Sequence, residues 1–214
     1  MNSNTVFFLD TEFIEDGKTI DLISIGITSL EGREYYAIST EFNPRKASQW
    51  VKENVLNNLP SRDVMPPIMP GGGSPREWEE SKAWKSRGQI RDDILNFTSG
   101  HEGKIEFWGE WCSYDWVVFC QLFGTMMDLP EGFPMRCRDI IQYAEDHLRI
   151  PSIDLPKSLE TDGNHNALLG ARTVKERFCW LKWGRNGWSP NSQGVEVNGA
   201  SSLRFNPRLS TEPC

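Results

Sequence analysis

The sequence predicts a single α/β domain. Three β-rich segments follow one another near the start, helical segments come next, and a later strand is followed by further helices. A chain of 214 residues with 38% hydrophobic residues can bury a substantial core in one domain. Two small domains fit this length less well.

The first three strands are expected to form an antiparallel meander. Four apolar residues at 6–9 indicate a short buried strand, and the segments 19–29 and 33–40 are rich in β-branched and aromatic residues. A turn that contains Gly32 separates the last two segments. Short connections of this kind join neighbouring antiparallel strands.

A helix and a loop are predicted after the meander. Residues 47–59 have helical apolar spacing and are expected to cover the sheet, with one apolar side made of Trp50, Val51, Val55, Leu56 and Leu59. Residues 61–75 contain four prolines and three consecutive glycines, which exclude a continuous helix or a central strand. The segment at about 61–77 is therefore predicted to be an inserted loop that can be mobile.

The second half alternates between helices and one strand. Residues 83–100 predict a helix that ends near Gly100, and 104–111 predict a strand. Ser113 is expected to cap the next helix, which closes at Gly124. Residues 138–148 have the spacing of another amphipathic helix.

The last regular segment is a helix over 165–183. Its inward positions are expected to be Ala167, Leu168, Ala171, Val174 and Phe178. Residues 184–214 are rich in Gly, Asn, Ser and Pro and lack apolar periodicity, so they predict a polar tail that is extended, disordered or docked on a partner. The domain itself is expected to span residues 1–183.

Composition narrows the class of protein. No apolar run approaches the roughly 20 residues that span a bilayer, and the start lacks a secretory signal, so we expect a soluble, cytoplasmic protein without membrane contact. The five cysteines form no CxxC pair and are expected to be free thiols. A formal charge of −7 argues against coating long nucleic acids, although bound cations can still create a small site for a nucleic-acid end.

Four residues form the candidate catalytic set. Asp10 and Glu12 follow the first strand and point to one face of an extended chain, where a cation would relieve their mutual repulsion. Asp115 lies in the first turn of a helix and His165 at the start of the last one. Each has an ordinary alternative: a polar turn for the acidic pair, a helix-dipole partner for Asp115 and a polar helix terminus for His165. Their combination favours a catalytic site.

The pattern resembles the DEDD exonucleases of the His-containing type (DEDDh). That family begins with Asp-x-Glu, seen here as DTE, adds an Asp, seen in SYDWVVFCQLFG, and ends with a His that precedes a further Asp by five residues, where this chain reads HNALLGAR. The stretches FFLDTEFIEDGKTIDLISIG, GREYYAISTEF and YDWVVFCQLFG most resemble the ribonuclease AS group, 3′-5′ exoribonucleases with a preference for polyadenylate. The resemblance covers about residues 5–182.

The resemblance implies a ribonuclease H-like mixed sheet flanked by helices, a homodimer, and two Mg²⁺ or Mn²⁺ ions. It implies that Asp10 bridges both ions, that Glu12 helps to hold the ion on the nucleophile side, and that Asp115 holds the ion on the leaving-group side. His165 would take the proton from the attacking water. Carboxylate oxygens suit these hard cations, and a histidine titrates near neutral pH.

One position departs from the family pattern. Gly170 stands where the family has its fourth carboxylate, and neither Asp162 nor Glu176 restores the spacing. The nucleophile-side ion should therefore bind more weakly and this chain should be reduced in activity or inactive, whether Gly170 is natural or introduced. Alternatively, Gly170 permits close packing.

The substrate expected from the resemblance is the 3′ end of single-stranded RNA, from which nucleoside monophosphates are released. Phe13, Trp111 and Tyr114 lie beside the acidic residues, where they can stack on bases, although Phe13 and Trp111 could equally be core residues. Two other functions stay open. One is an RNA 3′-end binding protein without turnover, and the other is a 3′-5′ DNA exonuclease of the same superfamily.

Overall fold

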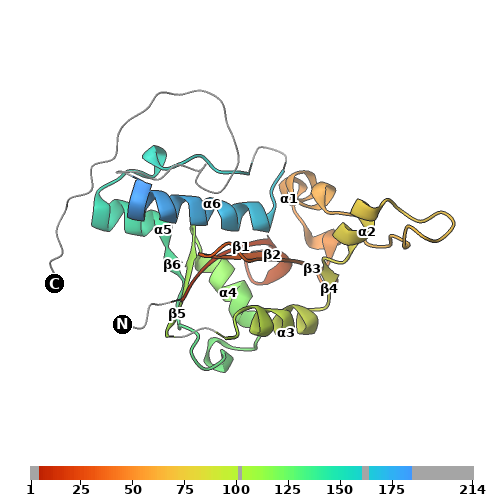
Figure 1. Cartoon of the computed structure of the whole chain (residues 1–214), viewed down its shortest axis with the longest axis horizontal. Coiled ribbons are helices and arrows are strands. Elements are labelled where there is room, and N and C mark those ends of the chain that lie inside the picture. The colour runs from red at the N-terminus through yellow and green to blue at the C-terminus, as the bar shows by residue number, and fades with distance from the viewer. Residues whose placement is uncertain (1–4, 101–102, 161–163, 185–214) are drawn as a thin grey trace.

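The computed structural model describes residues 5–100, 103–160 and 164–184, and these form a mixed sheet with helices on both faces (Figure 1). The sheet has six strands in the order β4-β3-β2-β1-β5-β6. The pairs β1–β2 and β2–β3 are antiparallel, whereas β1–β5, β5–β6 and β3–β4 are parallel. The strands are β1 (Thr5–Glu15), β2 (Ile20–Ser29), β3 (Glu34–Ser39), β4 (Trp84–Lys85), β5 (Ile105–Gly109) and β6 (Arg138–Asp139).

The antiparallel meander β1-β2-β3 is confirmed, but the first strand is much longer than predicted. β1 continues past the apolar residues 6–9 to Glu15, with an irregularity in its pairing between Glu12 and Phe13. Asp10 and Glu12 thus lie inside β1 and not beyond its end. The prediction placed the strand end at the first charge, whereas pairing with β2 keeps the chain extended through both acids.

The alternation of side chains along β1 separates two hydrophobic cores. Phe7 and Leu9 belong to a core with residues of α3 (Arg87–Phe97) and α4 (Ser113–Gln121). Val6 and Phe8 belong to a core with residues of α5 (Ile140–Gln142) and α6 (Ala167–Cys179). Figure 1 shows α6 above the sheet and α3 and α4 below it. Because side chains alternate in a strand, even-numbered residues of β1 point towards α6 and odd-numbered ones towards α4.

The start of α6 lies directly on β2. A Cβ added to Gly26 would collide with the backbone of Ala167 and Leu168, so only glycine at this position lets the helix approach so closely. Residue 26 is opposite Asp10 in the β1–β2 pairing. This contact therefore brings the first turn of α6 next to the acidic part of β1.

The segment between β3 and β4 differs in part from the prediction. The helix expected over 47–59 is α1 (Gln49–Asn54) followed by a 3₁₀ turn, Leu56–Asn58. Val55 is buried in a third core, but Trp50, predicted to face inward, is 53% exposed. Residues 60–74 lack regular helix or strand, and α2 (Pro75–Ser81) begins inside the predicted loop with a capping box at Ser74 and Glu77.

Several predicted boundaries move. The segment 83–100 contains β4 and then α3, which starts at a capping box formed by Ser86 and Gln89. Ser113 is the first residue of α4, so it does not cap that helix; Cys112 occupies the cap position without a side-chain hydrogen bond. The segment predicted as a helix over 138–148 is β6, α5 and a π-helical turn. The remaining short turns are 3₁₀ at Pro44–Lys46, Met126–Asp128 and Ser152–Asp154 and π at Tyr143–His147 and Trp180–Gly184.

Three further predictions can be compared with the structure. The described cysteines, Cys112, Cys120, Cys137 and Cys179, are free thiols, as expected. Over the described ranges, no helix combines the length and the apolar character that a membrane span requires. The predicted tail, apart from Gly184, lies outside the described residues, as does Asp162.

Candidate active site

Asp10 of β1 opens into a pocket beside α6. Asp10 contributes to a pocket of about 360 Å³ whose other lining residues are Glu110, Trp111, Ser158, Glu160, His165, Gly170, Thr173 and Val174. Asp10 and Glu12 are even-numbered residues of β1 and so point towards α6. The structure thus brings together Asp10, His165 and Gly170, which the sequence analysis placed in one site.

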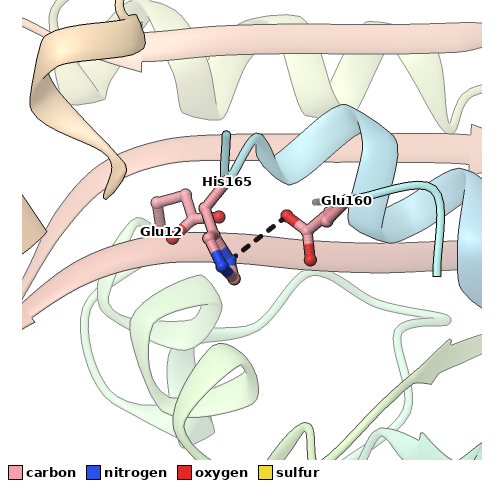
Figure 2. Close-up of side chains that lie close together, drawn as sticks. All are labelled: Glu12, Glu160 and His165. Atoms are coloured by element: carbon pink, nitrogen blue, oxygen red, sulfur yellow. Dashed lines mark ion pairs between the residues drawn. The ribbon is translucent and has the colours of Figure 1, made fainter. Parts of the chain in front are cut away.

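Among the described residues, Glu12, Glu160 and His165 form a group of three possible metal ligands. Each of the three offers one ligand atom, and these atoms lie within 4.8 Å of one another. Figure 2 shows the three side chains gathered beside the strand, with the pair between Glu160 Oε1 and His165 Nδ1, 3.8 Å apart, drawn dashed. Glu160 was not identified from the sequence. It lies outside any regular element, so neither periodicity nor a motif spacing pointed to it.

Hydrogen bonds to α6 hold the segment that carries Glu160. The backbone N–H of Leu159 donates to Thr173 Oγ1 at 2.9 Å, and the hydroxyls of Ser158 and Thr173 lie 3.4 Å apart. The backbone N–H of Asn166 donates to Glu160 Oε1 at 2.9 Å. These bonds involve Asn166 at the start of α6 and Thr173 in its second turn. The Glu160 carboxylate is therefore fixed relative to His165.

His165 is held by a backbone hydrogen bond of its own and by the helix cap at the next residue. Its backbone N–H donates to the carbonyl of Asn54 at the end of α1, at 3.0 Å. The next residue, Asn166, caps α6 by accepting from the N–H groups of Leu168 and Leu169. The ring of Trp50 lies against the imidazole with a centroid distance of 4.8 Å, which explains why this tryptophan faces away from the core.

Asp115 reaches the same region from the opposite face of β1. Its Oδ1 accepts hydrogen bonds from the Thr11 hydroxyl at 2.6 Å and from the Thr11 backbone N–H at 2.9 Å. Thr11 is an odd-numbered residue of β1 and so points towards α4, where Asp115 occupies the first turn as predicted. Asp115 is buried, and its charge raises the pKa of both Asp10 and Glu12.

The electrostatics favour protonated acids when no cation is bound. Burial, then repulsion from Glu160 and Asp115 and a hydrogen bond with Glu160, raises the pKa of Glu12 to about 8. Burial and then the charge of Asp115 raise the pKa of Asp10 well above its usual range. Burial raises the pKa of Asp115 to about 6, even though the hydrogen bonds from Thr11 oppose that rise. Proximity of like charges is the shared cause after burial.

The donor set fits divalent cations such as Mg²⁺ or Mn²⁺. In the described part of the chain, no Lys or Arg forms an ion pair with Asp10, Glu12, Asp115 or Glu160. Glu110, the other acid in the pocket, is already paired with Arg177. Several carboxylates held together without a cationic side chain form the hard oxygen environment that these ions prefer.

Gly170 lies beside Asp10. A Cβ built at residue 170 would be 2.5 Å from Asp10 Cγ and 3.0 Å from Asp10 Cβ. The Asp10 side chain therefore fills the space that a side chain on α6 would need. The alternative that Gly170 permits close packing is in accord with this contact, and the family's fourth carboxylate is absent from the helix. Neither Asp162 nor Glu176 restores the sequence spacing, but another acid, Glu160, lines the same pocket as Gly170.

The aromatic residues predicted to contact substrate lie around the acids in different environments. Trp111 is 65% exposed, has a φ of 50° and lines the pocket, so it is not a core residue. Phe13 packs partly on the core below the sheet and contacts the exposed ring of Tyr114 edge-on, at 5.9 Å. Trp50, predicted to lie on the apolar side of its helix, is a further exposed ring next to His165.

Comparison with known proteins finds relatives by sequence and a solved structure of similar fold. No protein-family model matches it. Two curated proteins named 3′-5′ exoribonuclease, from Mycobacterium tuberculosis strains CDC 1551 / Oshkosh and ATCC 25618 / H37Rv, are each 42% identical to it over 175 residues, which are 80% of this chain and 90% of theirs. The solved structure of S. pombe Pop2p in its Mg²⁺ and Mn²⁺ bound form has a TM-score of 0.50 and 13% identity, covering 84% of each chain.

The structural likeness concerns the fold alone, and it confirms the ribonuclease H-like fold that the sequence predicted. The sequence relatives concern the family. On the strength of an identity of 42% that extends over most of both chains, this protein belongs to the 3′-5′ exoribonuclease family.

Proposed function

We propose that this protein is a metal-dependent 3′-5′ exoribonuclease that releases nucleoside monophosphates from the 3′ ends of single-stranded RNA, with a preference for adenylate. The observation that carries the proposal is that His165 lines one pocket with Asp10 and also groups with Glu12, in a chain related to exoribonucleases. Asp115 adds a fourth group from the other side of β1. The adenylate preference, the DEDDh subtype and a homodimer are proposed from the family resemblance.

The acidic residues are assigned to Mg²⁺ or Mn²⁺. Asp10, Glu12 and Asp115 would hold the cations, which when bound stabilise the attacking and leaving oxygens of a phosphodiester. Thr11 orients Asp115 through two hydrogen bonds, so one oxygen of that carboxylate is fixed before metal or substrate arrives. Because α6 carries no carboxylate at residue 170, we propose one tight and one weak cation site and a turnover below that of relatives with an acid there.

His165 is assigned as the general base. Histidine is a common general base in enzymes, and Glu160 beside Nδ1 would stabilise the charged imidazolium that forms when the ring accepts a proton. The backbone contact with Asn54 fixes the start of the segment. The ring is therefore oriented by α1 and by Glu160 before substrate binds.

The substrate is assigned from charge and exposed rings. A chain with a formal charge of −7 offers little to the backbone of a long duplex, whereas unpaired bases can stack on Trp111, Tyr114 or Phe13. We propose that residues 1–183 form the exonuclease domain, with an insert at about 61–77, and that 184–214 are a tail.

A nuclease assay separates this function from its rivals. Labelled single-stranded oligoadenylate, the matching DNA and a blunt RNA duplex are incubated with Mg²⁺, Mn²⁺ or EDTA, and mononucleotide release is measured. We expect release from single-stranded RNA only with metal, and its loss in His165→Ala. RNA binding without release, in both this chain and Gly170→Asp, would support the RNA 3′-end binding protein, and faster release from DNA would support the DNA exonuclease.

A further inference from the structure

We infer that Glu160 supplies the fourth carboxylate of this site, in place of the side chain that residue 170 lacks. The inference rests on the proposed metal-dependent function. It places a ligand of the weaker cation site outside α6, the helix on which the DEDDh pattern has its fourth acid. It makes Glu160 a ligand of that cation as well as the partner of His165.

The position of Glu160 is the first argument. Its carboxylate groups with Glu12 and His165 with ligand atoms within 4.8 Å, and it shares the pocket with Asp10 and Gly170. A cation that contacts Glu12 on the histidine side is therefore within reach of Glu160. The acid belongs to the segment before α6 and lines the same pocket as Gly170.

The anchoring of this segment is the second argument. The hydrogen bonds from Asn166 to Glu160 and from Leu159 to Thr173 attach it to α6 on both sides of Gly170 in sequence. Thr173 is itself buried and one helical turn beyond Gly170, and its hydroxyl also bonds to the carbonyl of Leu169. A ligand held in place before the metal arrives loses little conformational entropy on binding.

The state of the neighbouring groups is the third argument. Two acids outside the family pattern line the pocket, Glu110 and Glu160. Glu110 is paired with the guanidinium of Arg177, whereas Glu160 has His165, the Asn166 N–H and Glu12 beside it and, within the described residues, no ion pair with a Lys or Arg. Glu160 is thus the acid with coordinating capacity to spare. With Asp10, Glu12 and Asp115 it restores a count of four carboxylates.

The experiment measures metal binding and not turnover. Mn²⁺ is titrated calorimetrically into the full unsubstituted chain and into the variants Glu160→Gln and Glu131→Gln. Glu131 is an exposed acid, so its variant is a charge-matched control. Glutamine keeps an oxygen that can accept from Asn166. We expect the weaker Mn²⁺ site to lose at least about 10-fold in affinity in Glu160→Gln, the lower end of what outer-sphere partners contribute, and to be unchanged in Glu131→Gln.

A second background makes the test specific. In Gly170→Asp a carboxylate is available from α6, so Glu160→Gln should cost much less Mn²⁺ affinity there than in the chain with Gly170. Thermal unfolding in EDTA checks folding, and Glu160→Asp, which keeps a carboxylate, should bind Mn²⁺ more tightly than Glu160→Gln.

Equal Mn²⁺ affinity in the full chain, Glu160→Gln and Glu160→Asp would overturn the inference, as would the same loss in both backgrounds. Neither result would affect the proposed nuclease, which stands or falls on metal-dependent release from RNA. Conversely, a Glu160-dependent Mn²⁺ site in a chain that releases no nucleotide would support the inference about the ligand and contradict the proposed function.

Discussion

The side chain of Asp10 occupies the space that any side chain at residue 170 would need. A Cβ at that position would lie 2.5 Å from Asp10 Cγ, so Asp10 must rotate before residue 170 can be anything but glycine. Glycine in a helix interior costs about 1 kcal/mol relative to alanine. The packing of β1 against α6 at this point therefore depends on a residue that disfavours the helix.

Gly170→Asp should raise metal-dependent activity. The substitution supplies the carboxylate that the DEDDh resemblance implies at this position, and bound cations would offset its repulsion with Asp10 and Glu12. We expect faster release of mononucleotides from labelled oligoadenylate in Mg²⁺ or Mn²⁺, and no gain of stability in EDTA. Removal of His165 from the repaired chain should abolish most of the gain, since a positioned base typically contributes about 10²- to 10⁴-fold.

Gly170→Ala is the matched control for this change. It introduces the same Cβ and the same displacement of Asp10 but no carboxylate. Nuclease activity should stay level or fall, and the unfolding temperature in EDTA should not show the rise expected from helix propensity alone. If alanine raised activity as much as aspartate, the effect would come from the movement of Asp10.

The metal-free protein should lose stability as the pH rises from about 5 to 8. Glu12 has a pKa of about 8 in the fold against 4.5 for an ordinary glutamate, so across this range the folded chain keeps a proton that the unfolded chain has released. Stability therefore falls with increasing pH, because the folded state binds more protons than the unfolded one. The raised pKa values of Asp10 and Asp115 act in the same direction.

Thermal unfolding in EDTA at several pH values checks this. Glu12→Gln removes a carboxyl whose pKa is raised to about 8 and should give a flatter profile, whereas Glu131→Gln, on the surface, should leave the slope unchanged. Added Mn²⁺ should stabilise most at the high-pH end, where the carboxylates are ionised. A slope that is the same in Glu12→Gln would contradict the assignment.

The sequence predicted the meander and proposed the candidate residues because these depend on local patterns. Asp10 and Glu12 follow from their place after an apolar strand, Asp115 from the first turn of a helix, and His165 from the start of the last helix together with the family resemblance. The length of β1 was missed because its extension past Leu9 depends on pairing with β2, which no local pattern encodes. Tertiary pairing decides strand length more than local composition does.

Glu160 and Trp50 were missed for a different reason. Glu160 lies in an irregular segment that reaches the site only through hydrogen bonds to Thr173 and Asn166. Trp50 has the spacing of a core residue on α1, but its neighbour in space, His165, is 115 positions away in the sequence. Contacts between distant segments determine both placements.

Thr11→Val should impair metal binding without altering the shape of the strand. The Thr11 hydroxyl donates to Asp115 Oδ1 at 2.6 Å, and both residues are buried. A hydrogen bond to a charged group is worth about 1.5–3 kcal/mol, so the carboxylate should be harder to ionise and activity should fall by about 10- to 150-fold. The backbone bond from residue 11 remains.

The measurement combines turnover with the pH dependence of Mn²⁺ affinity. In Thr11→Val the midpoint, the pH at which Mn²⁺ affinity is half-maximal, should rise, because Asp115 loses a donor that favours its charged form. Thr11→Ser keeps a hydroxyl and should restore both activity and midpoint. A midpoint that stays in place in Thr11→Val, with activity lost, would show a merely structural defect.

Trp50→Ala should weaken RNA binding and reduce any preference for adenylate. The ring is 53% exposed and lies 4.8 Å from His165 between centroids, so a terminal base that enters the pocket has an aromatic face beside it. Stacking of a base on an aromatic side chain is worth about 1–3 kcal/mol, which corresponds to about 5- to 150-fold in affinity. Purines stack over a larger area, so oligoadenylate should lose more affinity than oligouridylate.

Trp183→Ala provides the control. Trp183 is similarly exposed, at 52%, but it follows the far end of α6 and its ring contacts Phe178. Binding of fluorescent oligoadenylate and oligouridylate is measured for both variants in Ca²⁺, which occupies carboxylate sites and is a poor substitute for Mg²⁺ in its preferred geometry. We expect Trp183→Ala to bind both oligomers as the full chain does. If Trp50→Ala also kept its affinity and its ratio between the two oligomers, Trp50 would serve only to hold the imidazole of His165, and turnover at saturating RNA would be the quantity that falls.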